Sequence, residues 1–164
     1  MKKIFLLFII FALGSCDAPQ QNPNFEKNVE LTKAWFENWE NEDLDYLSSK
    51  IGESIEWQGA FYANKEYFTT KEDVVAYISG WLAAMEDINY EPENFLPGVD
   101  PETSLPNGSV RTYGYWSGTN TASGKTFRGL WYHYLTFNEE GKIINGADFG
   151  DATGLVMSVM PDQE

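Results

Sequence analysis

The only cysteine of the chain, Cys16, occupies a position at which a thiol has a defined chemistry. A basic start at Lys2 and Lys3 precedes an apolar run, residues 4–12, that is too short to cross a bilayer. Small residues then lead directly to Cys16, as in a bacterial lipoprotein signal, where the thiol takes a diacylglyceryl group. The alternative is an ordinary secretory signal with a chance cysteine. We expect residues 1–15 to be removed and the chain to be held in the bacterial cell envelope by acyl chains on Cys16.

A second candidate for chemistry is the pair formed by Asp148 and the only histidine, His133. In a strand predicted over residues 127–137, alternate side chains share a face, and His133 lies on one of them. If the 138–141 loop closes a hairpin, His133 is opposite Gly146, and Asp148 is its diagonal neighbour on the same face. A shift of one residue would place the two side chains on opposite faces. The pair therefore depends on the register of this hairpin.

Composition excludes several classes of function. The net charge of −14 and the lack of a basic cluster disfavour nucleic acid and anionic lipid surfaces as partners. With Cys16 acylated, no thiol remains for a disulfide, and a single histidine without a thiolate argues against a zinc site. Gly124-Lys125-Thr126 resembles the end of a phosphate-binding loop, but Gly118 is one residue too far upstream. We expect no metal and no cofactor.

The remaining sequence indicates one domain on a tether. Residues 16–24 comprise the acylated cysteine and a polar, proline-containing segment without apolar periodicity. Residues 25–160 form the predicted domain, and residues 161–164 form a short tail. Aromatic residues make up 16% of the chain, and few cations accompany them. This composition suggests a protein that encloses something apolar, although packing alone also uses aromatic side chains.

Apolar spacing predicts helices first and strands afterwards. The predicted helices cover residues 25–39, a short segment from Asp43 to Leu47, and a third segment that begins at a capping box formed by Thr69 and Glu72. The predicted strands cover residues 54–61, 109–118, 125–138 and 142–149. Four prolines predict that residues 91–107 are mostly loop, with room for one short strand. This order favours an α+β domain with its helices on one face of a sheet.

Two segments resemble the nuclear-transport-factor-2-like superfamily, and specifically its SnoaL-like members. Residues 35–47, WFENWENEDLDYL, are similar to the family's aromatic helix and the acidic corner after it. Residues 137–155, FNEEGKIINGADFGDATGL, are similar to its last hairpin and its Asp-aromatic-x-Asp ending. The resemblance implies a cone-shaped fold, in which a curved antiparallel sheet and three N-terminal helices enclose one pocket. It also implies dimerisation through the outer face of the sheet.

The resemblance gives His133 and Asp148 a role, because SnoaL-like cyclases carry an acid–base histidine and aspartate on these two strands. The aspartate would move a proton from an acidic carbon, and the histidine would orient it or stabilise an enolate oxygen. The alternative is a buried pair that only satisfies its own hydrogen bonds. Gln58 stands where relatives often have a histidine or an aspartate, which argues against hydrolysis.

The strand faces predict both a pocket and an interface. If Ser117 is opposite Thr126, then Gly114 is opposite Gly129, and two inward glycines leave space among large aromatic side chains. The predicted pocket residues are Trp57, Gly114, Trp116, Phe127, Gly129 and Trp131. The predicted homodimer interface on the outer face consists of Tyr113, Tyr115, Leu130, Tyr132 and Tyr134.

Three functions are compatible with these predictions. The first is a tethered pocket that binds a small apolar or aromatic molecule without catalysis. The second is a lyase or isomerase that uses Asp148 and His133. The third is an interaction module whose outer sheet face recruits a partner. An open cavity that contains His133 and Asp148 would favour the first two over the third.

Overall fold

The computed structural model describes residues 21–61 and 68–162. Three helices precede the long strands, as the apolar spacing predicts: α2 (Phe25–Glu40), α3 (Leu44–Lys50) and α4 (Lys71–Ala84). The predicted signal and Cys16 lie outside the described residues. Within the described residues, no helix is both long enough and apolar enough to cross a membrane.

Side-chain caps fix the starts of these helices. Asp43 accepts a hydrogen bond from the backbone N–H of Tyr46 at 2.8 Å and caps α3, as predicted. The cap of α4 is Thr70, whose hydroxyl accepts from the N–H of Asp73 at 3.2 Å. The prediction of Thr69 is wrong by one residue, because Thr69 lies within a short strand that runs up to the helix.

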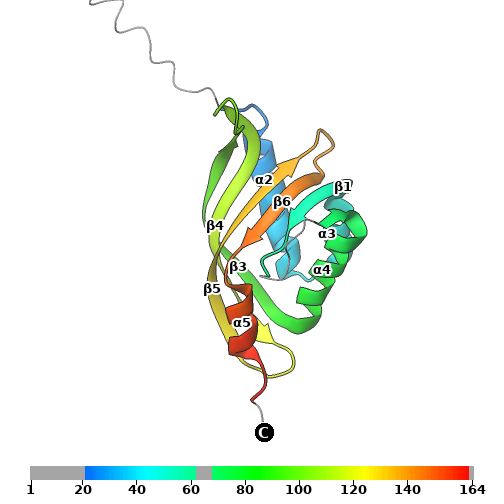
Figure 1. Ribbon diagram of the computed structural model, residues 1–164, viewed down its shortest axis with the longest axis vertical. Helices are drawn as coiled ribbons and strands as arrows, with labels where there is room; N and C mark the ends of the chain where they lie inside the picture. The colour runs from blue at the N-terminus through cyan, green and yellow to red at the C-terminus, as the bar shows by residue number, and fades with distance from the viewer. Residues whose placement is uncertain (1–20, 62–67, 163–164) are drawn as a thin grey trace, which may run out of the picture.

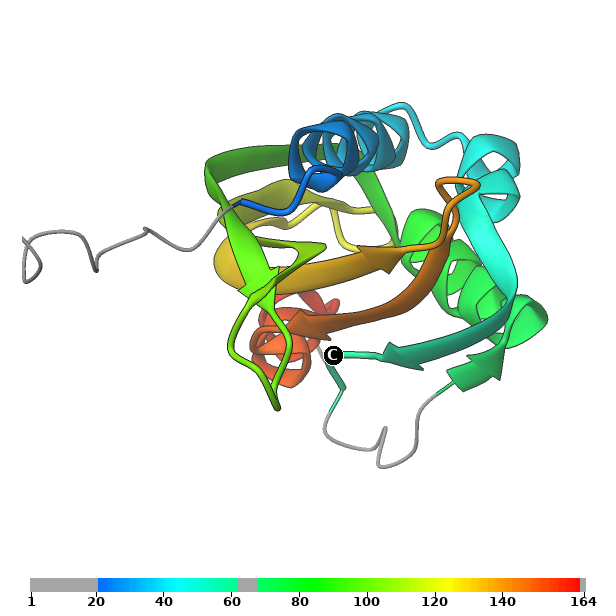
Figure 2. The ribbon, with the colours of Figure 1, turned by 90° about the horizontal axis from the view of Figure 1, so that it is seen from above.

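Six strands form one sheet in the order β2-β1-β6-β5-β4-β3. Figures 1 and 2 show that the sheet is strongly curved, with α2 and α4 on its concave side. The α+β class is confirmed, but β1 and β6 are parallel, whereas all other neighbours are antiparallel. These two strands are far apart in sequence, so no hairpin fixes their relative direction. The bounds are β1 (Ile51–Gln58), β2 (Phe68–Thr70), β3 (Met85–Val99), β4 (Pro106–Asn120), β5 (Thr126–Phe137) and β6 (Ile143–Phe149).

The prediction that residues 91–107 are mostly loop is wrong, because β3 continues through Pro92 to Val99. This strand is at the edge of the sheet, where a residue without an N–H leaves no interior ladder bond unmade. The register also shifts between Pro92 and Asn94 and between Pro97 and Val99. Such bulges accommodate proline in a strand.

Both predicted registers are wrong by two residues. His133 is directly opposite Asp148 rather than Gly146. Phe137 pairs with Ile143 instead of Lys142, which shifts the register by one residue, and the irregularity between Thr136 and Phe137 shifts it by one more. Likewise, Ser117 is opposite Arg128 rather than Thr126, because β4 extends to Asn120 before the chain turns. An even shift leaves every side chain on its predicted face.

A further helix, α5 (Ala152–Val159), closes one end of the molecule, and the sequence analysis does not predict it. Asp151 caps its N-terminus by accepting from the N–H of Gly154 at 2.8 Å. At its C-terminus, the carbonyl oxygen of Val159 accepts from Ser123, and that of Met160 accepts from Lys125. A cation at this end also complements the helix dipole. The 120–125 turn thus holds α5 against the sheet.

Candidate functional site

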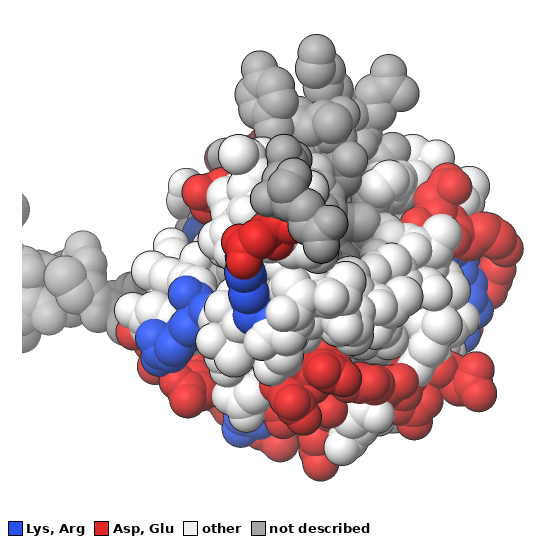
Figure 3. Space-filling model, turned by 90° about the horizontal axis from the view of Figure 1, so that it is seen from below, with Lys and Arg blue, Asp and Glu red and all other residues white. Residues whose placement is uncertain are grey.

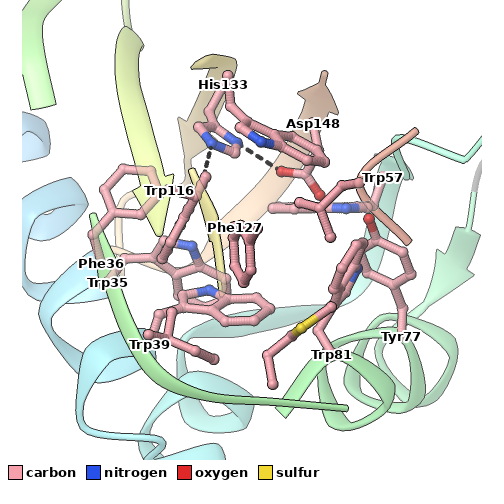
Figure 4. A pocket seen from close by; sticks show the side chains of 14 residues that line it. Trp35, Phe36, Trp39, Trp57, Tyr77, Trp81, Trp116, Phe127, His133 and Asp148 are labelled. Atoms are coloured by element: carbon pink, nitrogen blue, oxygen red, sulfur yellow. Dashed lines mark hydrogen bonds and ion pairs between the residues drawn. The ribbon is translucent and has the colours of Figure 1, made fainter. Parts of the chain in front are cut away.

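The concave side of the sheet contains a cavity of about 70 Å³ lined by aromatic side chains. All six tryptophans of the chain line it, together with His133 and Asp148. Figure 4 shows the rings arranged around the space and the carboxylate of Asp148 pointing among them. The lining residues are Trp35, Phe36, Trp39, Trp57, Tyr77, Trp81, Met85, Ile88, Trp116, Phe127, Trp131, His133, Asp148 and Leu155.

Four of the six predicted pocket residues line the cavity: Trp57, Trp116, Phe127 and Trp131. Gly114 and Gly129 do not line it, and they are not opposite each other. A Cβ on Gly114 would lie 2.6 Å from the ring of Tyr90, so the volume that the glycine releases is already filled. A Cβ on Gly129 would lie 3.3 Å from the indole nitrogen of Trp131. The proposed origin of the cavity in these two glycines is therefore wrong.

Other glycines shape the wall instead. A Cβ on Gly146 would lie 2.6 Å from the six-membered ring of Trp57, which therefore packs directly on the β6 backbone. The indole of Trp131 packs on Gly150 in the same way. The sequence analysis does not predict these contacts. The signal in the sequence is the position of the glycines: Gly146 lies within β6, and Gly150 follows directly after its last residue. Close approach of a ring to the backbone is possible only where no Cβ intervenes.

His133 and Asp148 meet across the β5–β6 ladder. Their atoms Nδ1 and Oδ1 are 2.7 Å apart, and their side chains are only 6% and 13% exposed. The two side chains lie on the same inner face, as predicted. Direct opposition brings them closer than the diagonal placement that the sequence register gives.

Trp116 determines the protonation of this pair. Its indole N–H donates to Nε2 of His133 at 2.8 Å. An indole nitrogen can only donate, so Nε2 must accept, and the imidazole proton is assigned to Nδ1. His133 is therefore neutral and donates from Nδ1 to the carboxylate of Asp148. The sequence analysis places Trp116 in the pocket wall but not in this chain of hydrogen bonds. Trp116 is opposite Gly129, which is four residues from His133 along β5, so the strand register alone does not bring the two side chains together.

The carboxylate lies among apolar walls without a cationic neighbour. Among the described residues that line the cavity, none is a lysine or an arginine. The pKa of Tyr77 is raised well above its usual value by burial and by the negative charge of Asp148. Burial, with a smaller contribution from the same carboxylate, raises the pKa of Tyr90 to about 12. Both phenols therefore remain protonated at neutral pH.

The cavity also contains an unsatisfied donor. In the described part of the chain, Trp57 Nε1 is a buried side-chain nitrogen without a hydrogen-bond partner. Buried polar atoms are nearly always satisfied, so an exception calls for an explanation. Trp57 lines the cavity alongside Asp148 and Tyr77, and Figure 4 shows the three side chains on the same side of it.

Comparison with known proteins identifies the fold. No protein-family model matches the sequence, and no curated protein matches it either. Solved structures do match. A hypothetical protein from Catenulispora acidiphila with a ketosteroid isomerase-like fold, in complex with trimethylamine, is 13% identical, with a TM-score of 0.64 over 81% of this chain and 94% of its own. A candidate isomerase from Bacillus subtilis is 12% identical, with a TM-score of 0.67 over 87% of this chain and 100% of its own.

A candidate SnoaL-like polyketide cyclase from Shewanella denitrificans is 10% identical, with a TM-score of 0.64 over 83% of this chain and 96% of its own. The fold is nuclear-transport-factor-2-like. At these identities the comparison establishes the architecture, and similar structures with this architecture include cyclases and isomerases.

In this nuclear-transport-factor-2-like fold, the side chains predicted to form an interface lie together on the outer sheet face. The rings of Tyr113 and Tyr132 are 4.9 Å apart, and Arg128 lies 3.7 Å from the ring centre of Tyr115. Leu130 is 51% exposed. Phe149, which the sequence analysis did not include, extends this surface by contacting the rings of Tyr132 and Tyr134.

Proposed function

We propose that this protein is a lipid-anchored binding protein that encloses a small organic molecule in the tryptophan-lined cavity. The observation that carries the proposal is that all six tryptophans converge on one cavity with His133 and Asp148. Apolar pockets with a few convergent polar groups are the usual sites of small-molecule binding. Here the polar groups are the carboxylate of Asp148 and the indole N–H of Trp57.

The size of the cavity limits the ligand. An apolar cavity of about 150 Å³ holds benzene, and this one measures about 70 Å³. A polycyclic molecule would require the walls to move, so we expect a ligand of only a few non-hydrogen atoms. The Catenulispora neighbour, which is in complex with trimethylamine, supports a ligand of this size.

Binding without catalysis is favoured by the state of His133. Its Nδ1 is engaged by Asp148 and its Nε2 by Trp116, so neither nitrogen is available to a ligand. A histidine held in this way orients the carboxylate but has no N–H with which to stabilise an enolate oxygen. Of the two roles implied by the family resemblance, we retain the orienting one.

Mass spectrometry of small molecules retained by the purified full chain tests the proposal. Leu155→Trp places a larger side chain in the cavity wall, whereas Met157→Trp places the same side chain at a position on α5 that is 70% exposed. We expect the first variant to lose a molecule that the wild type and the second variant retain. Equal retention by both variants, or no retained molecule in any of them, would contradict the proposal.

Proton-transfer catalysis is a second candidate, because a carboxylate held by a neutral histidine can act as a base in the cavity. Asp148 would remove a proton from a carbon next to a carbonyl group and return it to the resulting enolate. Exchange of the α-hydrogens of acetone, which has four non-hydrogen atoms, in D₂O measures this step. We expect Asp148→Asn to slow exchange roughly 10²-fold, while the exposed Glu139→Gln leaves it unchanged. Equal rates for the wild type and Asp148→Asn would exclude this candidate.

The membrane anchor belongs to the proposal and has its own test. Cys16→Ser removes the thiol that would carry the diacylglyceryl group. We expect the variant to keep its signal uncleaved or to leave the membrane fraction. Processing to mature length with full membrane retention would contradict the lipid anchor.

We also propose that two copies of the chain associate through the outer sheet face. A cluster of exposed aromatic and apolar side chains on one face, such as these tyrosines with Leu130, is typical of an interface. Leu130→Asp places a charge in the middle of that surface, and Met157→Asp places the same charge on α5. Light scattering of the detergent-solubilised chain is expected to find a dimer for the wild type and Met157→Asp, and a monomer for Leu130→Asp. A wild-type monomer at high micromolar concentration would rule the dimer out.

A further inference from the structure

The aromatic rings of the cavity present faces in several directions. Trp81 and Trp131 are nearly perpendicular, at 89° with their centres 6.3 Å apart. Trp39 and Trp116 meet at 63° on another side of the cavity. Rings set at such angles surround the space on several sides (Figure 4), and we call this arrangement the aromatic box. The negative face of an aromatic ring attracts a cation that lies above it within about 6 Å.

Asp148 gives this box a charge that the protein does not neutralise. The side chain is only 13% exposed, and its partner His133 is neutral because Trp116 donates to Nε2. The lysines and arginine in ion pairs of the described chain are engaged with exposed acidic residues elsewhere. A carboxylate in an apolar setting without a counter-charge is unfavourable. A cation in the cavity would remove this cost.

The surface charge of the molecule acts in the same direction. The chain has a net charge of −14. On the face shown in Figure 3, acidic side chains gather along the lower and right-hand edges around a broad uncharged area. Such a distribution raises the local concentration of cations and repels anions.

We propose that the ligand of the cavity is a small organic cation with a methylated ammonium group. The N-methyl groups would contact the indole faces, and the positive charge would be balanced by the carboxylate of Asp148. A metal ion is a poor match, since the described lining supplies one carboxylate and no cluster of oxygen or nitrogen ligands. A neutral ligand of the same size would leave the carboxylate uncompensated. This inference rests on the proposed binding function and specifies its ligand class.

A groove beside the cavity offers a route for such a ligand. It measures about 450 Å³ and lies between α4, α5 and the turn after β4. Tyr77, Trp81 and Met85 line both the groove and the cavity. Movement of these three side chains would connect the two spaces. The groove is lined mainly by apolar atoms of α4 and α5, which suits the passage of methyl groups.

Two probes of similar size and shape separate charge from volume. Trimethylammonium is a methylated cation, and 2-methylpropan-2-ol is neutral. Because all six tryptophans line the cavity, the intrinsic fluorescence of the full chain reports its occupancy. We expect trimethylammonium to bind at least tenfold more tightly than the alcohol, which corresponds to about 1.4 kcal/mol. Unmethylated ammonium, at the same ionic strength, is expected to bind at least tenfold more weakly than trimethylammonium.

The Asp148→Asn variant tests the source of the preference. We expect the ratio of the two affinities to fall close to one in this variant and to keep its wild-type value in Glu139→Gln, which removes the same charge from an exposed hairpin position. If Asp148→Asn does not fold, the ratio measured on the wild type still decides the question. Equal binding of trimethylammonium and the alcohol would overturn the cation inference and leave the binding function standing. Binding of neither probe, together with no retained molecule, would overturn both.

Discussion

Replacing Trp116 with phenylalanine keeps a ring in the cavity wall but removes the N–H that donates to His133 Nε2. A buried acceptor that loses its donor costs about 1–3 kcal/mol, in addition to the packing lost with the smaller ring. Trp39→Phe isolates the packing contribution, because Trp39 lines the same cavity and contacts Trp116 edge-on at 5.8 Å. Its indole makes no hydrogen bond to the described residues. We expect Trp116→Phe to be less stable than Trp39→Phe by about 1–3 kcal/mol.

Urea unfolding followed by far-ultraviolet circular dichroism measures this difference without depending on the substituted indoles. The only histidine of the chain provides a second readout. Long-range ¹H–¹⁵N correlation spectra of the untagged chain should show the Nδ1–H tautomer in the wild type and in Trp39→Phe, and a changed Nε2 signal in Trp116→Phe. If the two variants are equally stable within about 0.5 kcal/mol and the Nε2 signal does not move, the hydrogen-bond chain through His133 is refuted.

Three further predictions concern stability. Gly146→Ala should destabilise the fold by about 1–3 kcal/mol, since the added Cβ would meet the ring of Trp57. Gly80→Ala should stabilise it by up to about 1 kcal/mol, because Gly80 lies in α4 and a Cβ there would have nothing within 4 Å. Thermal unfolding compares the two variants. Thr70→Ala should cost about 1 kcal/mol by removing the α4 cap, and rescue by Thr70→Ser would show that the hydroxyl is responsible. The folded state favours the neutral phenol of Tyr90, so its stabilising contribution is complete below about pH 10 and is lost as the pH rises towards its folded pKa of about 12. Denaturant unfolding at increasing alkaline pH should therefore show a smaller loss for Tyr90→Phe than for the wild type, and identical losses would contradict the assignment.

The inner face of the site could be predicted from sequence because side chains alternate along a strand. His133 and Asp148 are on the same face in the predicted and observed registers, since the two differ by an even number of residues. The register itself could not be predicted. It depends on the pairing of Phe137 with Ile143 next to the turn and on the irregularity between Thr136 and Phe137, and no residue type at these points requires either.

The error at Gly114 follows from the error at β3. Local sequence rules treat proline as a strand breaker, but Pro92 and Pro97 are tolerated because β3 is at the sheet edge, and the strand order is a property of the whole fold. Once β3 is taken as a loop, Tyr90 has no assigned position. The sequence pattern then gives no sign of the Tyr90 ring that fills the space at Gly114. The role of the tryptophans in α2 and α4 cannot be predicted from the sequence either, because one apolar stripe on a helix serves a filled core and a cavity wall alike.

The edges of the sheet limit how copies of this chain can associate. At one edge, β3 presents two prolines and three register shifts. At the other, β2 is only three residues long. An incoming strand needs a straight row of free N–H and C=O groups, and neither edge provides one. The proposed lipid anchor would concentrate copies of the chain on one surface, and the edges described here would not support strand-to-strand polymerisation between them. The broad face of the sheet would then be the surface left for contacts between copies.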